Sequence, residues 1–321
     1  MKHLVLLRFS SRFSDRQLGF CGAALLTLCC LWGCGTTRIQ VPVLRPAEIN
    51  TSGFKRAVVL GFKNTTALSN EGDQLEFTLA RRLVETNRFT VIDKALFDQS
   101  MRSQVTPMND VLVISGVVNE YSYTETINES KPYQRDGKTF VDYQRNGVVR
   151  LGVSFQVSRT SNGQILGGRA LLQEIPASVA ATNSQPPPLI VANMVAEARE
   201  RLVAAFLKKI VPYEEIVGVD FYSEKTIPEI DNGITAAQQG DWDAALQIFG
   251  MATNKHASNQ QVHVAWYNLA LALQCVARFG EAEQAFLRAI RLAPTTTEYQ
   301  RALERCRQLA NDYRRVQQES Q

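Results

Sequence analysis

The chain has 321 residues, of which 45% are hydrophobic and 21% charged, and its 35 basic and 31 acidic residues give a formal net charge of +4. This composition is typical of a globular protein and excludes a disordered or low-complexity chain. The length exceeds the usual size of one domain, so we expect two domains.

The first residues have the layout of a secretory signal. An apolar run without any charge, Leu18–Trp32, follows four basic residues: Lys2, Arg8, Arg12 and Arg16. As a helix this run would be about 22 Å long, short of the roughly 30 Å hydrocarbon core of a bilayer. We therefore expect residues 1–33 to be a cleaved signal peptide and not a spanning helix.

The apolar run ends in Leu31-Trp32-Gly33-Cys34, which resembles the bacterial lipobox, although Trp32 is bulkier than the small residue usual at its place. The resemblance implies that Cys34 becomes the lipidated N-terminus, and several acyl chains together anchor a protein stably. Gly35 follows where an aspartate would retain many lipoproteins at the inner membrane. We therefore expect an outer-membrane lipoprotein that faces the periplasm; the alternative is an ordinary signal peptide that happens to contain cysteines.

Loss of the leader also removes charge and cysteines. Its four basic residues and Asp15 carry +3, so +1 of the net +4 remains. Nucleic-acid binding normally needs a basic face, and we expect none here. Of the cysteines, Cys275 and Cys306 remain beside Cys34. An oxidising periplasm would let them pair, but we favour two buried, unpaired side chains.

Residues 34–53 hold two prolines and little periodicity, which predicts a lipidated cysteine followed by an extended tether. Residues 54–222 predict an α/β domain with a mixed sheet covered by helices, in which 215–222 closes the sheet. We expect strands at 56–62, 90–93, 111–118, 148–158, 164–175 and 215–222, and helices at 71–85, 94–104 and 191–210.

Residues 226–321 predict an all-α domain with an internal repeat. Two segments resemble tetratricopeptide repeats (TPRs), whose small residues let paired helices touch. The matching positions, which we expect to pack the repeats and to line a partner groove, are Gly233, Trp242, Ala245, Phe249, Trp266, Leu269, Ala270, Ala282, Phe286 and Ala289. A capping helix over 297–317 follows. The alternative is an unrelated pair of helical hairpins. Three or more repeats normally bury a solenoid core, so two copies predict docking on the first domain or on a partner.

The sequence contains no motif of an enzyme, a metal site or a cofactor site, and we expect none of these. After cleavage only His256 and His263 remain as histidines, both far from any nucleophile motif. Asp241 and Asp243 lie at a repeat turn, where helix capping and solvation explain them. A group of tyrosines predicts cross-strand packing, with ligand or peptide binding as the alternative: Tyr121, Tyr123, Tyr133 and Tyr143.

Across roughly residues 41–222 the chain resembles the family of CsgG, the curli-secretion lipoprotein. The run AVVLGFKNTT is similar to its first strand and F-x-N loop, with Phe62 and Asn64 at the motif positions. RFTVIDKALFDQSMRSQ is similar to its next strand and helix, and DVLVISGVVNEYSY and RLGVSFQVSRTSNGQILGGRA to later strands. The same domain occurs in LpoB, a lipoprotein activator of a cell-wall synthase, so the resemblance implies a fold and leaves the function open.

Three functions follow. The first is a non-enzymatic scaffold that binds either a secretion or envelope-assembly protein or a cell-wall synthase. The sequence leaves open whether this scaffold also forms a homo-oligomer. The second is a subunit of a CsgG-type secretion pore, but residues 119–131 offer no apolar face and the return strand, 141–155, is interrupted by Arg145. A second hairpin would pass through Pro176. The third is an LpoB-like regulator of a cell-wall synthase. We favour the scaffold.

Overall fold

The computed structural model describes residues 35–103 and 111–319. The predicted signal peptide and the lipidation of Cys34 lie outside the described residues. Residues 35–321 form one compact unit. Its apolar side chains gather mainly in two cores, one beside a five-stranded sheet and one among the C-terminal helices.

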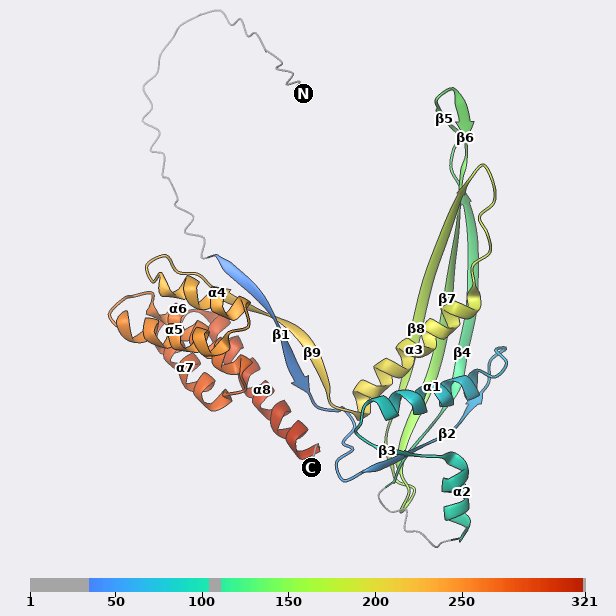
Figure 1. Cartoon of the computed structure of the whole chain (residues 1–321), viewed down its shortest axis with the longest axis horizontal. Coiled ribbons are helices and arrows are strands. Elements are labelled where there is room, and N and C mark those ends of the chain that lie inside the picture. The colour runs from blue at the N-terminus through green and yellow to red at the C-terminus, as the bar shows by residue number, and fades with distance from the viewer. Residues whose placement is uncertain (1–34, 104–110, 320–321) are drawn as a thin grey trace, which may run out of the picture. The chain divides into compact units, whose positions relative to one another are not determined.

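The five-stranded sheet has the order β3-β2-β4-β7-β8 (Figure 1). Three parallel strands, β2 (Arg56–Asn64), β3 (Thr90–Ile92) and β4 (Val111–Glu129), form one side of it. β7 (Asp142–Arg159) and β8 (Ile165–Thr182) continue it antiparallel. The predicted α/β fold with a mixed sheet is therefore confirmed for this part of the chain.

Alternation along β7 decides which face of the sheet is covered. Every second side chain is buried, namely Val149, Leu151, Val153, Phe155 and Val157. Two helices, α1 (Glu71–Glu85) and α3 (Val191–Ile210), pack on this face. The ring of Phe155 stacks on Phe206 of α3 with 4.2 Å between centroids. On the opposite face α2 (Lys94–Ser103) inserts Phe97 against β2 and β4.

β4, β7 and β8 are longer than the sequence predicts. β4 has a bulge at Asn119, which turns Tyr121 and Tyr123 toward the same core face as Val118. β8 passes through Pro176, which is tolerated because β8 is an edge strand. The small hairpin of β5 (Tyr133–Arg135) and β6 (Lys138–Phe140) joins β4 to β7.

Three of the four tyrosines named from the sequence have packing contacts. In the small hairpin the ring of Tyr133 stacks across the strands on Phe140 at 5.8 Å, and Tyr121 and Tyr123 pack against the sheet core. For these three the structure agrees with the predicted packing role, and for Tyr143 it stays a prediction.

Two sequence predictions fail at the ribbon of β1 (Thr36–Arg45) and β9 (Tyr213–Tyr222). Residues 36–45 of the segment predicted as an extended tether form instead the strand β1, which pairs antiparallel over its whole length with β9. The same pairing means that β9 does not close the five-stranded sheet. The inner residues of this ribbon, Ile39, Val41 and Phe221 among them, are buried in the helical core.

The helical region follows β9 and agrees with the predicted all-α segment. It consists of α4 (Glu229–Gln238), α5 (Trp242–Lys255), α6 (Val262–Cys275), α7 (Phe279–Leu292) and α8 (Thr297–Glu319). Consecutive helices contact one another from α4 to α8. The helix α8 takes the place of the predicted capping helix and begins at the same residue.

Candidate functional site

Helix α1 presents three different sides, because successive residues turn by about 100°. One side buries Leu75, Leu79 and Leu83 against the sheet. A second side faces α3. The third carries Phe77 and Val84, which stay exposed at 67% and 57%. A helix with an apolar core side needs no further apolar stripe for folding, so this third side is the candidate binding feature.

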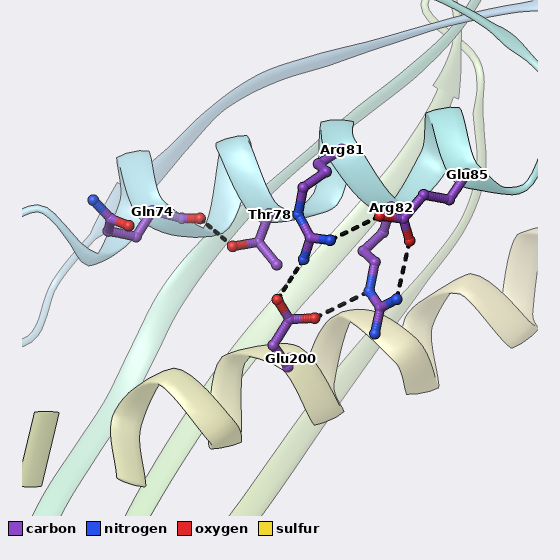
Figure 2. A network of polar contacts seen from close by, with 6 residues as sticks. All are labelled: Gln74, Thr78, Arg81, Arg82, Glu85 and Glu200. Carbon is purple, nitrogen blue, oxygen red and sulfur yellow. Dashed lines mark hydrogen bonds and ion pairs between the residues drawn. The ribbon is translucent and has the colours of Figure 1, made fainter. Parts of the chain in front are cut away.

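The second side of α1 is fixed to α3 by a network of ion pairs (Figure 2). Both oxygens of Glu200 accept hydrogen bonds, from Arg81 at 2.5 Å and from Arg82 at 3.0 Å. The same two arginines donate to Glu85 at 2.7 and 3.0 Å. The hydrogen bond from Arg82 lowers the pKa of the Glu85 carboxyl. Because these groups are exposed, the network contributes mainly to orientation and little to stability.

A buried ion pair holds the start of the same helix. Arg199 of α3 donates two hydrogen bonds, of 2.7 and 2.9 Å, to the carboxylate of Glu71. The side chain of Glu71 is 4% exposed and that of Arg199 14%. A bidentate pair in such a place costs several kcal/mol if one partner is removed, since the other charge is left buried. It therefore fixes α1 over the sheet.

The third side of α1 forms one wall of an open groove of about 700 Å³. Six of the lining residues are apolar, namely Val59, Phe77, Ala80, Val84, Val91 and Ile92, and five are charged: Asp73, Glu76, Arg81, Asp93 and Lys94. A lining of apolar and charged side chains together is usual in a protein-binding surface. We name this feature the α1–β3 groove.

The α1–β3 groove lies beside an edge strand. β3 is the terminal strand of the five-stranded sheet, and within residues 35–103 and 111–319 it pairs only with β2. An edge strand offers backbone N–H and C=O groups to an additional strand, and the groove beside it offers pockets for that strand's side chains. The arrangement is thus suited to an extended peptide segment.

Of the residues predicted for the TPR-like segment, most are fully buried packing residues. Gly233 lies against the ring of Phe249 so closely that a Cβ atom there would meet it at 2.5 Å. Seven of the ten are buried, and Trp242, Trp266 and Leu269 are partly buried in the same core. The structure brings all ten together in one helical core.

The chain's own ribbon packs against these helices. Asn268 of α6 is fully buried, accepts a hydrogen bond from the backbone N–H of Tyr222 at 3.1 Å and donates one to its carbonyl at 2.8 Å. The ring of Phe221 lies 6.0 Å from Phe249, and that of Tyr222 lies 5.2 Å from Tyr267. β9 therefore occupies the helical surface at this point in the way that a bound peptide would.

The two histidines have structural partners. His256 lies 2.9 Å from a carboxylate oxygen of Glu229, and His263 lies 2.9 Å from the hydroxyl of Tyr299. Hydrogen bonds from Lys255, the backbone and His256 lower the pKa of Glu229 to about 2. Burial lowers the pKa of His263. These contacts join helices of the repeat segment.

Asp241 caps α5, as predicted: its side chain accepts the N–H of Ala244 at 3.0 Å. Cys275 and Cys306 are free thiols, and burial raises their pKa to about 12 and about 11. This agrees with the preferred prediction of two unpaired side chains.

Within residues 35–103 and 111–319, no group of three or more histidine, cysteine or acidic side chains is placed to hold a metal ion. No helix in the same ranges is both long and apolar enough to cross a membrane.

The sequence matches no family model and no curated protein. Among solved structures, the chain is similar to a dodecamer of a PelC variant from Paraburkholderia phytofirmans, at 17% identity over 55% of this chain and 98% of that one, with a TM-score of 0.29. It is also similar to the lipoprotein GNA1162 from Neisseria meningitidis, at 14% identity over 47% and 98%, with a TM-score of 0.25. A third is the C-terminal domain of LpoB from Salmonella enterica, at 12% identity over 38% and 84%, with a TM-score of 0.23. The similar structures thus include bacterial lipoproteins, but at these TM-scores the likeness does not bear on function.

Sequence reasoning missed the α1–β3 groove. The signal was present, because Phe77 and Val84 are seven residues apart and so share a side of α1. The core leucines of α1 repeat at the same helical spacing, so Phe77 and Val84 look like part of one buried apolar side. The sequence pattern alone does not show that these two side chains lie on a separate, exposed side.

Proposed function

We propose that this chain is a lipid-anchored, non-enzymatic scaffold of the bacterial outer membrane, facing the periplasm, whose α1–β3 groove binds an extended segment of a partner protein. The observation that carries the proposal is the exposed apolar wall of α1 beside β3, which is an edge strand in the part of the chain that the structure describes. The secretory leader and the lipobox-like residues ending at Cys34 support the location.

In this proposal the partner adds one strand to the sheet. Its backbone pairs with β3, which accounts for affinity without sequence dependence, and its alternate side chains enter the groove below Phe77 and Val84. Lining residues of both charges, such as Asp73 and Lys94, then fix the register. A secretion or envelope-assembly protein and a cell-wall synthase both remain candidates for the partner.

The helical region has a different role in the proposal. We assign its ten TPR-like positions to packing, with β1 and β9 belonging to the helical domain and the sheet domain lying between them in sequence. Because β9 already occupies the surface around Asn268, the helices support the ribbon and the partner binds at the sheet. In this proposal the boundary between the two domains differs from the predicted one, which ended the α/β domain at residue 222 and began the all-α domain at residue 226.

The secretion-pore alternative receives less support from the long strands. On one face of β4, β7 and β8 the charged side chains of Glu120, Arg150 and Glu174 lie side by side, with Arg150 within 3.8 and 2.9 Å of the two carboxylates. On the other face Arg145 pairs with Glu125. Charges on both faces are costly in contact with lipid.

Membrane location is tested with Cys34→Ser. We expect this variant to appear in the soluble periplasmic fraction or to keep its leader, because it lacks the thiol that would be acylated. The wild-type chain should fractionate with outer membranes and carry acyl mass on its first residue. Wild-type protein with an unmodified Cys34 thiol would contradict the anchor.

Partner binding is tested with Phe77→Glu. The side chain is 67% exposed, so we expect folding to be unaffected and partner recovery after crosslinking in cells to fall at least tenfold. Met251→Glu on α5, 50% exposed in the wild type, is the matched control and should recover the partner normally. Equal recovery by both variants would contradict the role of the groove.

A further inference from the structure

The end of the β1–β9 ribbon is fixed at the first described residue. The carbonyl of Gly35 accepts a hydrogen bond from Ser223 N–H at 2.8 Å, and the strand pairing begins directly afterwards with Thr36 opposite Tyr222. Gly35 is thus part of the folded ribbon. The predicted tether of about 19 residues would have reached roughly 60 Å when extended. Cys34 directly precedes Gly35 in the sequence, so one peptide bond joins it to the first residue of the folded ribbon.

Two turns lie together beside this end of the ribbon. The first, residues 223–229, leads from β9 into α4, and the second, residues 255–261, joins α5 to α6. Asn259 donates a hydrogen bond to Thr226 at 3.2 Å, and Lys255 and His256 both bond to Glu229. We call this pair of turns the anchor-side rim.

In the anchor-side rim the two lysines, Lys225 and Lys255, are exposed, whereas the two acidic side chains are buried or paired. Glu224 is buried and accepts hydrogen bonds from the backbone and hydroxyl of Thr226 at 2.9 Å each. Glu229 is neutralised by Lys255. Lys225 is exposed, and the second turn offers small and amide side chains, Ala257, Ser258, Asn259 and Gln260. Its excess of exposed positive charge is small, so a covalent anchor must supply most of the membrane affinity.

We infer that the anchor-side rim rests on the phospholipid headgroups, held there by the lipid on Cys34 with no flexible spacer. This inference rests on the proposed lipid anchor. A lysine near an anionic leaflet contributes about fivefold to the occupancy of the contact. The helical domain is therefore seated on the membrane, whereas a tethered domain would sample the space above it.

The test uses residues 34–321, whose described contacts lie in one compact unit, coupled through the thiol of Cys34 to a maleimide phospholipid in vesicles of phosphatidylethanolamine and phosphatidylglycerol. This coupling tests the contact between the anchor-side rim and the headgroups independently of lipidation in cells. A fluorophore is placed through Ser258→Cys, labelled before coupling in a chain whose Cys34 is reversibly protected. We expect Cys275 and Cys306 to react slowly, because burial of these side chains raises the pKa of their thiols. A spin label on the lipid headgroups quenches the fluorophore.

We expect strong quenching in the native sequence and a several-fold loss when twelve Gly/Ser residues are inserted between Gly35 and Thr36, since such a linker adds about 19 Å of reach. Lys225→Glu should lower quenching, whereas Lys138→Glu on β6, the same charge change on the other domain, should not. Equal quenching with and without the insertion would overturn the inferred contact between the anchor-side rim and the headgroups. If the coupled protein shows the expected quenching in vesicles but Cys34 is unmodified in cells, the proposed lipid anchor is wrong. The inferred headgroup contact is then contradicted as well, because it rests on that anchor.

Discussion

The helical region and the sheet region differ in how their apolar side chains outside the regular helix and sheet packing are covered. In the helical region the chain covers the surface itself, because β1 and β9 pack into the helical core and Asn268 satisfies both backbone groups of Tyr222. In the sheet region Phe77 and Val84 remain uncovered beside the free edge of β3. The TPR-like positions of the helical region are therefore used for packing, whereas the sheet region keeps an apolar surface open to which the proposed partner would bind.

The largest expected effect tests whether ribbon and helices are one cooperative unit. Phe249 is fully buried between Gly233 and Phe221. Phe249→Ala should lower the free energy of unfolding by about 4 kcal/mol, from the lost apolar contact and the cavity left behind. Urea unfolding measures it, with Met251→Ala on the same helix as a control near zero. A loss below about 1 kcal/mol would mean that the helical core is not packed as described.

The next effect concerns the sheet region. Arg199→Met leaves the carboxylate of Glu71 buried without its partner and should cost about 3 kcal/mol. Arg201→Met removes a similar ion pair, with Glu197, from an exposed place and should cost less than about 0.5 kcal/mol. Equal losses in thermal unfolding would show that the Glu71 pair is solvated and does not fix α1.

A smaller effect is expected at the contact between ribbon and helices. Asn268→Ala removes the two side-chain hydrogen bonds that Asn268 makes to the N–H and C=O of Tyr222, and should cost about 2 kcal/mol. Hydrogen exchange should speed up at Tyr222 and along β9 while β7 keeps its protection. Equally faster exchange in β7 and β9 would show that the two regions unfold together, which would contradict the distinction drawn between them.

The thiols give the smallest and most local effect. Burial raises the pKa of Cys275 to about 12 and that of Cys306 to about 11. The stability linked to these neutral thiols is fully present below the unfolded value of about 9 and is lost as the pH rises through 9 toward 12. A thiol reagent at pH 8 should therefore react slowly with the folded protein and quickly in denaturant. Fast reaction of both thiols in the folded state would contradict their burial.

The sequence predicts best what is periodic and local. The ends of α1 and α3 agree with the predicted 71–85 and 191–210, because their apolar residues repeat at helical spacing. β7 follows from strict alternation of buried and exposed residues. The pairing of Thr36 with Tyr222 joins positions far apart in sequence, and no local pattern reports it.

The candidate site was harder to predict for a related reason. Neither the free edge of β3 nor the exposure of Phe77 is a property of a short segment, since both depend on which strand ends the sheet. The bulge at Asn119 likewise reverses the face on which the following residues of β4 lie, so alternation counted from the sequence alone does not give their surroundings.

The most direct measurement places a photo-crosslinking amino acid in the living cell at position 77 or 84 of α1, and, as controls, at positions 216 of β9 and 251 of α5, which are also at least half exposed. The proposed function predicts one adduct of the same mass from both α1 positions, with an envelope protein identified in it by mass spectrometry, and none from positions 216 and 251. Adducts from positions 216 or 251 together with none from α1 would place the partner on the helical region and contradict the account.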